Sequence, residues 1–477
     1  MLEPRDWTMK LVMKFGGVGV ADGKSLKRAG GIVSKFRTDG HELVIVTSAM
    51  YNVTNSLLDA ATRAGKGQRE HVKRFVEDVR KRHVDSAQIA IDNEEVLDRV
   101  VRTIESKCDD LKNILLGIAH IGELTPRSKD LVIGYGERFS APILQGVLED
   151  LGIESQSLTG GEAGIVTDDH FGGAEPLMNV TTLEVRQVMD PLLEKGIVPV
   201  VSGFIASTQD GTHTTLGRGG SDFTASIIGA AIRADEVWVW KDVDGLMTAN
   251  PKIAHDARMI DRISFSEAME LAHFGAQVIH PKALESAARF QLPFRVKSFG
   301  KLDGDGTLIV KEATVKDGDV VKAITNIDDV DLITVSGASM VGTPRLAARV
   351  LEILTDEDVD VLLISQSSSE ENITLAIPKN DGSRAQNALE LSLLGSKQVR
   401  EVSIEAGLSI VAVVGAGMKG TPGVAARVFA TMAAHNINIR AIAQGSSELN
   451  ISFIIKKQDA AEAIKALHND FKLGECA

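Results

Sequence analysis

The residues best suited to chemistry are gathered in TTLGRGGSD, residues 214–222, where three glycines accompany Arg218, Ser221 and Asp222. The apolar stretch FTASIIGAAIRA that follows predicts a helix, whose free N–H groups and positive dipole end would face this loop. Arg218 would strengthen such an anion site by binding a carboxylate, and Asp222 could hold Mg²⁺ or orient a lysine. A helix merely capped by Ser221 is the alternative, but a cap requires neither an arginine nor three glycines. We therefore favour an anion-binding site here.

Two further loops follow predicted strands. LVMKFGG, residues 11–17, is a strand that runs into Lys14, Gly16 and Gly17. Glycines let backbone N–H groups approach a phosphate and a lysine neutralises its charge, although paired glycines also form ordinary turns. KDVDGLMTANP, residues 241–251, follows the strand EVWVW and is well placed for a nucleotide, although its acids could equally form turns. The GKS at 23–25 is not a P-loop, because Val18 stands where that motif requires a glycine.

An internal repeat explains a third glycine-rich motif. GAGMKG, residues 415–420, has the spacing of a dinucleotide fingerprint, but Arg440 stands where the ribose-binding acid is expected. GASMVGTPRLAARV at 337–350 recurs as GAGMKGTPGVAARV at 415–428, and the same offset aligns 364–377 with 442–455. Two small α/β modules are therefore predicted between about residues 320 and 477. The GTP of each copy predicts a helix start, with Thr343 and Thr421 as N-caps followed by Pro344 and Pro422.

The first 300 residues must supply the frame that positions the loops. Buried-strand runs such as LVIVTSA, GIVPVVSGF and EVWVW alternate with helical periods, which predicts a mainly parallel sheet covered by helices. Between about 66 and 115 apolar residues recur along one helical face, which predicts a helical insertion. Clustered Gly and Asp at 301–309 and 315–323 indicate the seam between the two parts of the chain.

Composition limits the classes of function. The chain has 477 residues, 44% hydrophobic and 25% charged, as expected for globular domains. Its net charge of −13, without a basic block, argues against nucleic acid as a partner. We find no membrane-spanning run and no signal peptide, and with two cysteines, Cys108 and Cys476, we expect a cytoplasmic protein. Any metal must bind oxygen ligands, and His280 is assigned no chemistry because no second histidine stands at ligand spacing.

Together these motifs resemble the aspartate kinase family. The resemblance rests on KFGG (14–17), VTSAMYNVTN (46–55), GERFSA (136–141), FGGAEP (171–176), TTLGRGGSD, DVDG (242–245) and FGAQVIHP (274–281), followed by the paired modules. It implies an α/β amino-acid-kinase (carbamate-kinase-like) three-layer sandwich over 1–310 and two ferredoxin-like ACT domains over 320–400 and 401–477. It also implies transfer of the γ-phosphoryl group of ATP, with Mg²⁺, to the β-carboxylate of L-aspartate. The product, 4-phospho-L-aspartate, would serve lysine, threonine and methionine biosynthesis.

The resemblance also assigns roles to individual residues. Lys14 would stabilise charge on the transferring phosphoryl group, and Asp222 would organise Lys14 and the metal-bound phosphates. Glu137 would pair with the ammonium group of aspartate and Arg218 with a carboxylate. The other implied site residues are Ser48, Thr54 and Ser221 for aspartate, and Gly16, Gly17, Lys241, Asp242, Met247 and Lys252 for the nucleotide. No separate metal-binding residues are assigned.

Several positions depart from the family pattern. Val18 and Gly19 replace the usual Thr-Ser, Lys241 replaces the Thr of WTDVDG, and Gln277 replaces the lysine of FGAK. Because hydroxyls and a cation are lost, slower catalysis or weaker ATP binding is expected. An amino-acid-binding regulatory protein on a degenerate kinase scaffold is therefore one alternative. A kinase for another acceptor, such as acetylglutamate or glutamate, is a second alternative, which the C-terminal modules disfavour.

The resemblance finally implies regulation and assembly. Threonine or lysine is expected to act as an effector that binds between the two modules. The chain is expected to form a homo-oligomer, a dimer or a tetramer, through these modules. The residues predicted to bind the effector are Met340, Gly342, Thr343, Gln366, Ser368 and Asn372.

Overall fold

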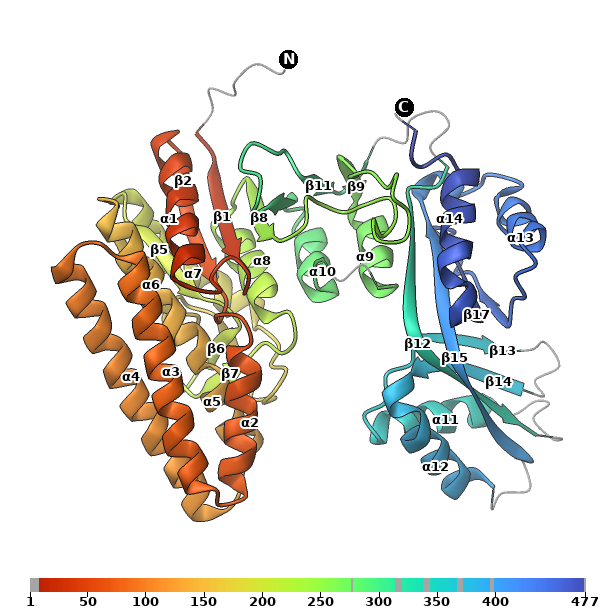
Figure 1. Ribbon diagram of the computed structural model, residues 1–477, viewed down its shortest axis with the longest axis horizontal. Coiled ribbons are helices and arrows are strands. Elements are labelled where there is room, and N and C mark those ends of the chain that lie inside the picture. Colours follow the sequence, from red (N-terminus) through yellow and green to blue (C-terminus); the bar gives the residue numbers. More distant parts are fainter. Residues whose placement is uncertain are drawn as a thin grey trace. The chain divides into compact units, whose positions relative to one another are not determined.

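The computed structural model describes residues 8–275, 278–313, 320–337, 344–366, 372–394 and 399–475. The chain divides into two compact units (Figure 1). Unit 1 comprises Met1–Leu246, Asp261–Phe265 and Val278–Ala313, and unit 2 comprises Met247–Ile260, Ser266–Gln277 and Thr314–Ala477. Two short segments that precede the predicted seam thus group with the C-terminal part of the chain.

An eight-stranded sheet forms the centre of unit 1. Its strand order is β3-β5-β2-β1-β8-β10-β11-β9, with β10–β11 as the antiparallel pair in an otherwise parallel sheet. β1 and β8 are buried along most of their length, as strands with helices on both faces must be. The predicted parallel sheet is therefore confirmed. The strands are β1 (Lys10–Phe15), β2 (Glu42–Thr47), β3 (Ser155–Thr159), β5 (Val198–Ser202), β8 (Glu236–Lys241), β9 (Arg262–Ser264), β10 (Phe294–Ser298) and β11 (Thr307–Val310).

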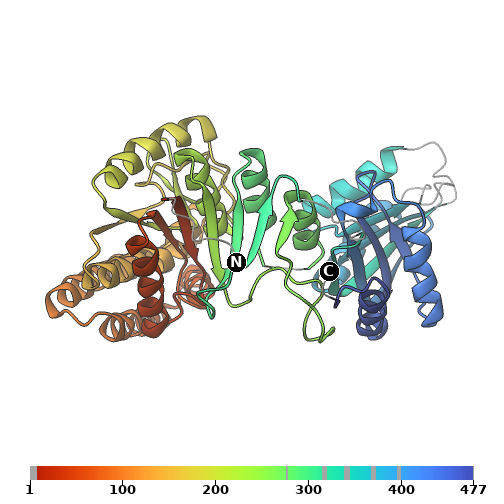
Figure 2. The ribbon, with the colours of Figure 1, turned by 90° about the horizontal axis from the view of Figure 1, so that it is seen from above.

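Helices cover both faces of this sheet, giving three layers (Figure 2). α1 and α6 pack on one face, whereas α7, α8 and α10 pack together on the other. Leu11, Met13 and Phe15 of β1 belong to the apolar core beneath α1. Because side chains alternate along a strand, Val12 and Lys14 point to the α8 face. The helices are α1 (Gly23–Thr38), α6 (Tyr135–Asp150), α7 (Met178–Glu194), α8 (Gly220–Ile232) and α10 (Pro281–Arg289).

A helical insertion follows β2, as the sequence predicts. α3 and α4 are long helices that lie side by side (Figure 1). Asn93 caps α4 by accepting hydrogen bonds from the amides of Glu95 and Val96, and α4 buries Val100 and Ile104 along its apolar face. The insertion contains α2 (Val53–Gly65), α3 (Arg69–Ala90), α4 (Glu94–Ile121) and α5 (Pro126–Ile133). A small second sheet in unit 1 contains β4 (Val166–Thr167), β6 (Ile205–Thr208) and β7 (His213–Thr215).

Unit 2 contains a six-stranded sheet with the order β13-β14-β12-β15-β17-β16. Its strands are β12 (Ala323–Ser336), β13 (Leu363–Gln366), β14 (Asn372–Pro378), β15 (Glu401–Val414), β16 (Ala441–Ala443) and β17 (Asn450–Lys456). Its helices are α11 (Pro344–Asp356), α12 (Gly382–Leu393), α13 (Val424–Ala434) and α14 (Ala460–Asp470), with the short 3₁₀ helices η1 (Lys379–Asp381), η2 (Ala416–Met418) and η3 (Lys457–Asp459). α9 (Phe265–His273) precedes them in the chain.

The two predicted modules share their longest strands. β12 and β15 run antiparallel beside each other from Ala323–Val414 to Ser336–Glu401 (Figure 1). One apolar core combines the C-terminal half of β12 with Val402 at the start of β15, and the other combines Ile324 at the start of β12 with the C-terminal half of β15. Each core therefore takes a strand segment from the other copy of the repeat.

The predicted helix starts differ between the copies. α11 begins at Pro344, as predicted, whereas Thr343 lies outside the described residues. α13 begins at Val424 after Gly423, so the prediction that Thr421 caps this helix and Pro422 opens it is wrong. Thr421 instead donates its hydroxyl hydrogen bond to the carbonyl of Gly417 at 2.7 Å. In the described ranges, none of the helices combines the length and apolar character needed to cross a membrane.

Candidate active site

A cavity of about 410 Å³ opens at the carboxyl ends of β1 and β8. β1 lies between β2 and β8 in the sheet. The next strand in the chain, β2, is thus on one side of β1, and the much later strand β8 is on the other side. Ligands in open α/β sheets bind in the crevice at such a switch point. The lining residues are Lys14, Gly17, Ser48, Ala49, Met50, Tyr51, Asn52, Thr54, Asn55, Glu137, Phe204, Gly217, Arg218, Gly219, Gly220, Ser221, Asp222 and Lys241.

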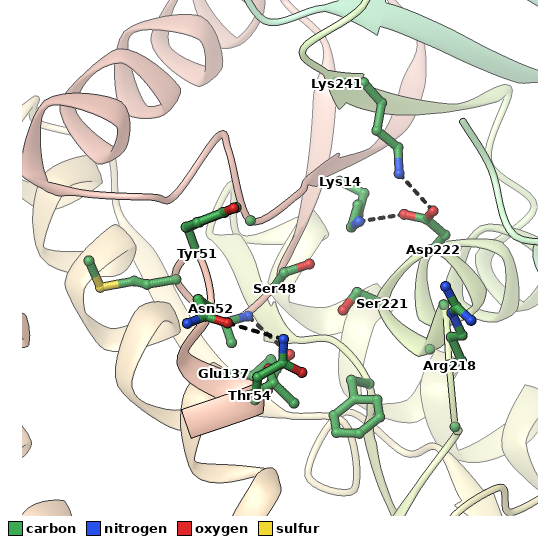
Figure 3. Close-up of a pocket in the computed structure, with 18 residues that line it drawn as sticks. Lys14, Ser48, Tyr51, Asn52, Thr54, Glu137, Arg218, Ser221, Asp222 and Lys241 are labelled. Carbon is green, nitrogen blue, oxygen red and sulfur yellow. Dashed lines mark hydrogen bonds and ion pairs between the residues drawn. The ribbon is translucent and has the colours of Figure 1, made fainter. Parts of the chain in front are cut away.

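Asp222 stands at the centre of the charged part of this cavity (Figure 3). Its Oδ1 pairs with Nζ of Lys14, and its Oδ2 accepts from Nζ of Lys241 at 2.9 Å. Burial alone would raise the pKa of Asp222, but its ion pairs with both lysines lower that pKa to about 2. Asp222 is therefore ionised at all physiological pH values.

Lys14 is a buried cation in this arrangement. Burial and the charge of Lys241 lower its pKa and Asp222 raises it, and the net result is a pKa of about 8. A side chain on Gly16 would lie 3.5 Å from Nζ of Lys14, so the glycine leaves open space beside the ammonium group. The close approach of a phosphate to this lysine is thereby possible.

The loop before α8 carries Arg218 to the same side of the cavity as Asp222 (Figure 3). Gly217 and Gly219 have left-handed φ values of 74° and 73°, which favour glycine. A Cβ on Gly219 would lie 2.2 Å from the ring of His280, so this position is closed to larger residues. Arg218 is exposed and has no ion-pair partner among the described residues, which leaves its guanidinium available to an anion.

Glu137 forms the buried wall of the cavity. It lies in the first turn of α6 with 3% of its surface exposed, and its Oε1 accepts from the amide of Ala49 at 3.0 Å. Burial raises the pKa of Glu137 to about 8, because the amide of Ala49 and the charge of Lys14 offset only part of the desolvation. Its Oε2 has no hydrogen-bond partner among the described residues and is available to a ligand donor.

The loop after β2 supplies the remaining polar groups. Ser48 and Thr54, to which the resemblance assigns aspartate binding, both line the cavity. The sequence prediction missed Asn52, which lines the cavity with a left-handed φ of 62° and accepts a hydrogen bond from Asn55 at 3.1 Å. Both asparagines lie inside VTSAMYNVTN, so the motif contained the signal.

The structure gathers nine of the 13 residues predicted to bind aspartate or the nucleotide or to act in catalysis. These nine line one cavity: Lys14, Gly17, Ser48, Thr54, Glu137, Arg218, Ser221, Asp222 and Lys241. Gly16 is adjacent to Lys14, whereas Asp242 is exposed and does not line the cavity. Ser221 lies within α8 rather than at its N-cap, which is Gly219.

The remaining predicted positions lie elsewhere in the chain. Met247 and Lys252 belong to unit 2. Of the predicted effector residues, Gln366 ends β13 and Asn372 begins β14. Met340, Gly342, Thr343 and Ser368, together with Gln277, lie outside the described residues. His280 caps α10 by accepting from the amide of Lys282 at 3.3 Å, a structural role.

The arrangement suits two anions brought together. Three cations line the cavity: Lys14, Lys241 and Arg218. Of the two acids that line it, Asp222 is ionised at pH 7 and Glu137 is protonated, so positive charge exceeds negative charge. Within the described ranges no group of three or more His, Cys, Asp and Glu side chains could hold a metal ion. A divalent cation would therefore depend on phosphate oxygens of a ligand, with Asp222 as the nearby carboxylate.

Comparison with known families identifies both parts of the chain. Residues 9–298 match the amino acid kinase family, and residues 333–393 and 411–471 match the ACT domain. Bifunctional aspartokinase/homoserine dehydrogenase 2 of Zea mays is 32% identical over 472 residues, which cover 97% of this chain and 51% of that protein. The chain thus spans about half the length of the first such relatives. Aspartokinase 1 of Arabidopsis thaliana is 30% identical over 96% of this chain and 80% of its own.

Solved structures give the same assignment. Aspartokinase III of E. coli in complex with aspartate and ADP superposes with a TM-score of 0.81 at 28% identity, covering 97% of this chain and 99% of that one. The same enzyme in complex with lysine and aspartate superposes with a TM-score of 0.80, with the same coverage. With the sheet, the switch-point cavity and the paired modules described above, the chain belongs to the amino acid kinase family and carries two C-terminal ACT domains.

Proposed function

We propose that this protein transfers the γ-phosphoryl group of ATP to the β-carboxylate of L-aspartate, giving 4-phospho-L-aspartate for lysine, threonine and methionine biosynthesis. The observation that carries the proposal is the pairing of Asp222 with Lys14 and Lys241 inside a cavity that Arg218 and Glu137 also line. Two anionic reactants repel each other in water, and this surplus of positive charge offsets that repulsion.

Aspartate would occupy the side of the cavity formed by α6 and the loop after β2. Its ammonium group would pair with the buried Glu137, and Arg218 would bind a carboxylate with two hydrogen bonds. Ser48, Thr54 and Ser221 line the cavity and would donate hydroxyl hydrogen bonds. These contacts would fix the β-carboxylate in one orientation, which converts binding energy into alignment.

The chemical step requires no general base. A β-carboxylate oxygen, already ionised, attacks the γ-phosphorus, and a new P–O bond forms as the bond to the β–γ bridging oxygen breaks. The electron pair of the broken bond leaves with ADP, and no proton moves. Lys14 would stabilise the charge on the equatorial oxygens of the transferring group, while Asp222 holds Lys14 in place.

The nucleotide would bind beside Gly16, Gly17 and Lys241 at the ends of β1 and β8. We retain Asp242, Met247 and Lys252 as proposed nucleotide residues from the family resemblance. When bound, Mg²⁺ would neutralise part of the charge of the phosphates. Asp222 is the side chain nearest to that role, because it is ionised and lies between the two lysines.

Regulation and assembly are proposed by the same reasoning. E. coli aspartokinase III has been solved with lysine, and threonine or lysine would here bind between the two ACT modules. The hydroxyl of Ser365 in β13 lies 3.5 Å from the carbonyl of Ile442 in β16, so these strands of the two copies adjoin. The kinase domain would cover residues 1–310 and the ACT domains 320–400 and 401–477, with assembly into a dimer or tetramer. The proposed effector residues remain Met340, Gly342, Thr343, Gln366, Ser368 and Asn372.

An ADP-release assay with L-aspartate and MgATP tests the proposal. Turnover that depends on aspartate, and that is not replaced by glutamate or acetylglutamate, supports it. Aspartate binding by calorimetry without turnover would instead favour a regulatory protein on a degenerate kinase scaffold. Lys14→Ala separates the two functions, because it should abolish turnover and leave aspartate binding largely intact.

A further inference from the structure

We propose that Lys241 is a second catalytic cation, which contacts the transferring phosphoryl group together with Lys14. The inference rests on the proposed function and deepens it. In the sequence WKDVDG this lysine directly precedes Asp242.

The geometry brings Lys241 to the reacting side of the cavity. It is the last residue of β8, which pairs with β1 in parallel register so that Lys14 lies opposite Val239. Its Nζ reaches Oδ2 of Asp222 at 2.9 Å, while Lys14 occupies Oδ1 of the same carboxylate. Figure 3 shows both ammonium groups in contact with the carboxylate of Asp222, and we place the same phosphoryl group within reach of both.

The hydrogen-bonding capacity of Lys241 is not used up by Asp222. An ammonium group has three N–H donors, and the bond to Asp222 accounts for one of them. The described residues provide no second acceptor for its Nζ. The Lys241 side chain is 20% exposed and lines the cavity, whereas those of Lys14 and Asp222 are each 6% exposed. The other two N–H donors of Lys241 are therefore available to a ligand in the cavity.

Charge balance gives the same result. Lys14 and Lys241 share Asp222 as their counter-charge, so the three side chains together carry one net positive charge. A net positive charge in a largely buried cluster favours an anionic ligand, which supplies the opposite sign. A role in positioning Asp222 alone would not need this second cation. An oxygen of the transferring phosphoryl group is the anion that both lysines can share.

The decisive comparison is between wild type and Lys241→Thr, which removes the charge and keeps a polar side chain. We expect kcat to fall by about 10²-fold, the usual effect of removing one transition-state donor. The KM for aspartate should change by less than about threefold, since acceptor binding is left intact. Lys241→Arg, which keeps the charge, should retain more activity than Lys241→Thr.

A binding measurement separates catalysis from simple positioning or nucleotide contact. Calorimetry would compare ADP alone with ADP, aluminium fluoride and aspartate, which together imitate the transferring group. Lys241→Thr should weaken the second set by at least about tenfold more than the first. Lys301→Thr is the matched control, because Lys301 pairs with Asp244 at the surface and its loss removes the same charge outside the cavity.

Each outcome decides between the hypotheses. A Lys241→Thr variant whose kcat lies within about threefold of wild type overturns the inference and leaves the kinase proposal standing. Equal weakening of ADP and of the aluminium fluoride complex assigns Lys241 to ground-state nucleotide binding and also overturns it. If wild type shows no turnover, the kinase proposal fails, but the calorimetric comparison still decides the role of Lys241. Circular dichroism and a thermal melt exclude misfolding as the cause of any loss.

Discussion

The carboxylate of Glu137 accepts a hydrogen bond from the amide of Ala49 at 3.0 Å, although the two residues are 88 positions apart. This contact joins α6 to the loop after β2 and fixes the acid against the wall of the cavity. One oxygen is thereby directed into the protein and the other is left for a ligand. The charge on Glu137 should therefore control how the cavity receives a cationic group.

Aspartate affinity should rise with pH up to about 8. Burial raises the pKa of Glu137 to about 8, so the free protein carries a proton there at pH 7, with Lys14 as the charged group that faces it. Pairing with an ammonium group requires the ionised acid, so binding should release a proton and affinity should approach about a tenfold gain per pH unit. Calorimetry in buffers of different ionisation enthalpy measures this release. Glu137→Gln should bind more weakly without that pH dependence, and a flat profile in wild type would contradict the assignment.

The same pKa predicts a stability effect without ligand. A carboxyl group whose folded pKa lies above its unfolded value of 4.5 stabilises the fold fully below pH 4.5. That contribution should be lost as the pH rises from 4.5 towards 8. Melting temperatures of wild type and Glu137→Gln, measured across this window, should therefore diverge in slope, with wild type losing stability faster. Parallel curves would show that Glu137 is ionised in the free protein.

Asp222→Asn should impair both stability and catalysis. It leaves Lys14 and Lys241 buried without their shared counter-charge, and removing one partner of a buried ion pair costs about 3–5 kcal/mol. Asp244→Asn breaks an exposed pair with Lys301 and should cost less than about 1 kcal/mol. Urea unfolding measures both effects. Because the pKa of Asp222 is lowered to about 2, its stabilisation is present above pH 3.8 and is lost as the pH falls towards 2.

Gly219→Ala should disable the loop that carries Arg218. The new Cβ would lie 2.2 Å from the ring of His280. The alanine would also have to adopt a left-handed φ of 73°. Gly211→Ala is the matched control, since its φ is 80° and its Cβ would meet nothing within 4 Å. The control should lose about 1–2 kcal/mol from backbone strain alone. In thermal melts, Gly219→Ala should lose more stability than Gly211→Ala. The KM for aspartate should rise only in Gly219→Ala. Equal effects in the two variants would exclude the steric explanation.

Inhibition should depend on the first copy of the repeat. Gln366→Ala should raise the threonine or lysine concentration that gives half inhibition by about tenfold or more while kcat stays unchanged, because an effector acts through unequal binding to two states. Gln444→Ala makes the same change at the equivalent position of the second copy. Initial-rate titrations with each amino acid compare them. Unaltered inhibition in Gln366→Ala would remove this residue from the effector site.

Much of the fold was predictable because it depends on local pattern. The buried runs around Lys14 and Trp240 indicate parallel strands, and the constant offset of the repeat is enough to predict two modules. The helix start at Val424 was not predictable, because GTP has the same letters in both copies and tertiary packing decides where the helix begins. The exchange of strand segments between the modules depends on long-range pairing, which has no local signature.

The site was predictable to a similar degree. Residues inside contiguous motifs, such as Arg218 and Asp222, could be located from their glycine-rich surroundings. The pairing of Asp222 with Lys241 could not, since it joins α8 to the end of β8 through space. The buried state of Glu137, and hence its raised pKa, likewise depends on packing of α6 against the sheet.

The strands β12 and β15 have a consequence for how the C-terminal unit can come apart. Since each apolar core contains strand segments from both copies, neither copy can melt while the other stays intact. We expect one cooperative denaturation step for the pair rather than two. A chain truncated between the two copies would lose one strand segment of the remaining apolar core. A single module should therefore not fold on its own.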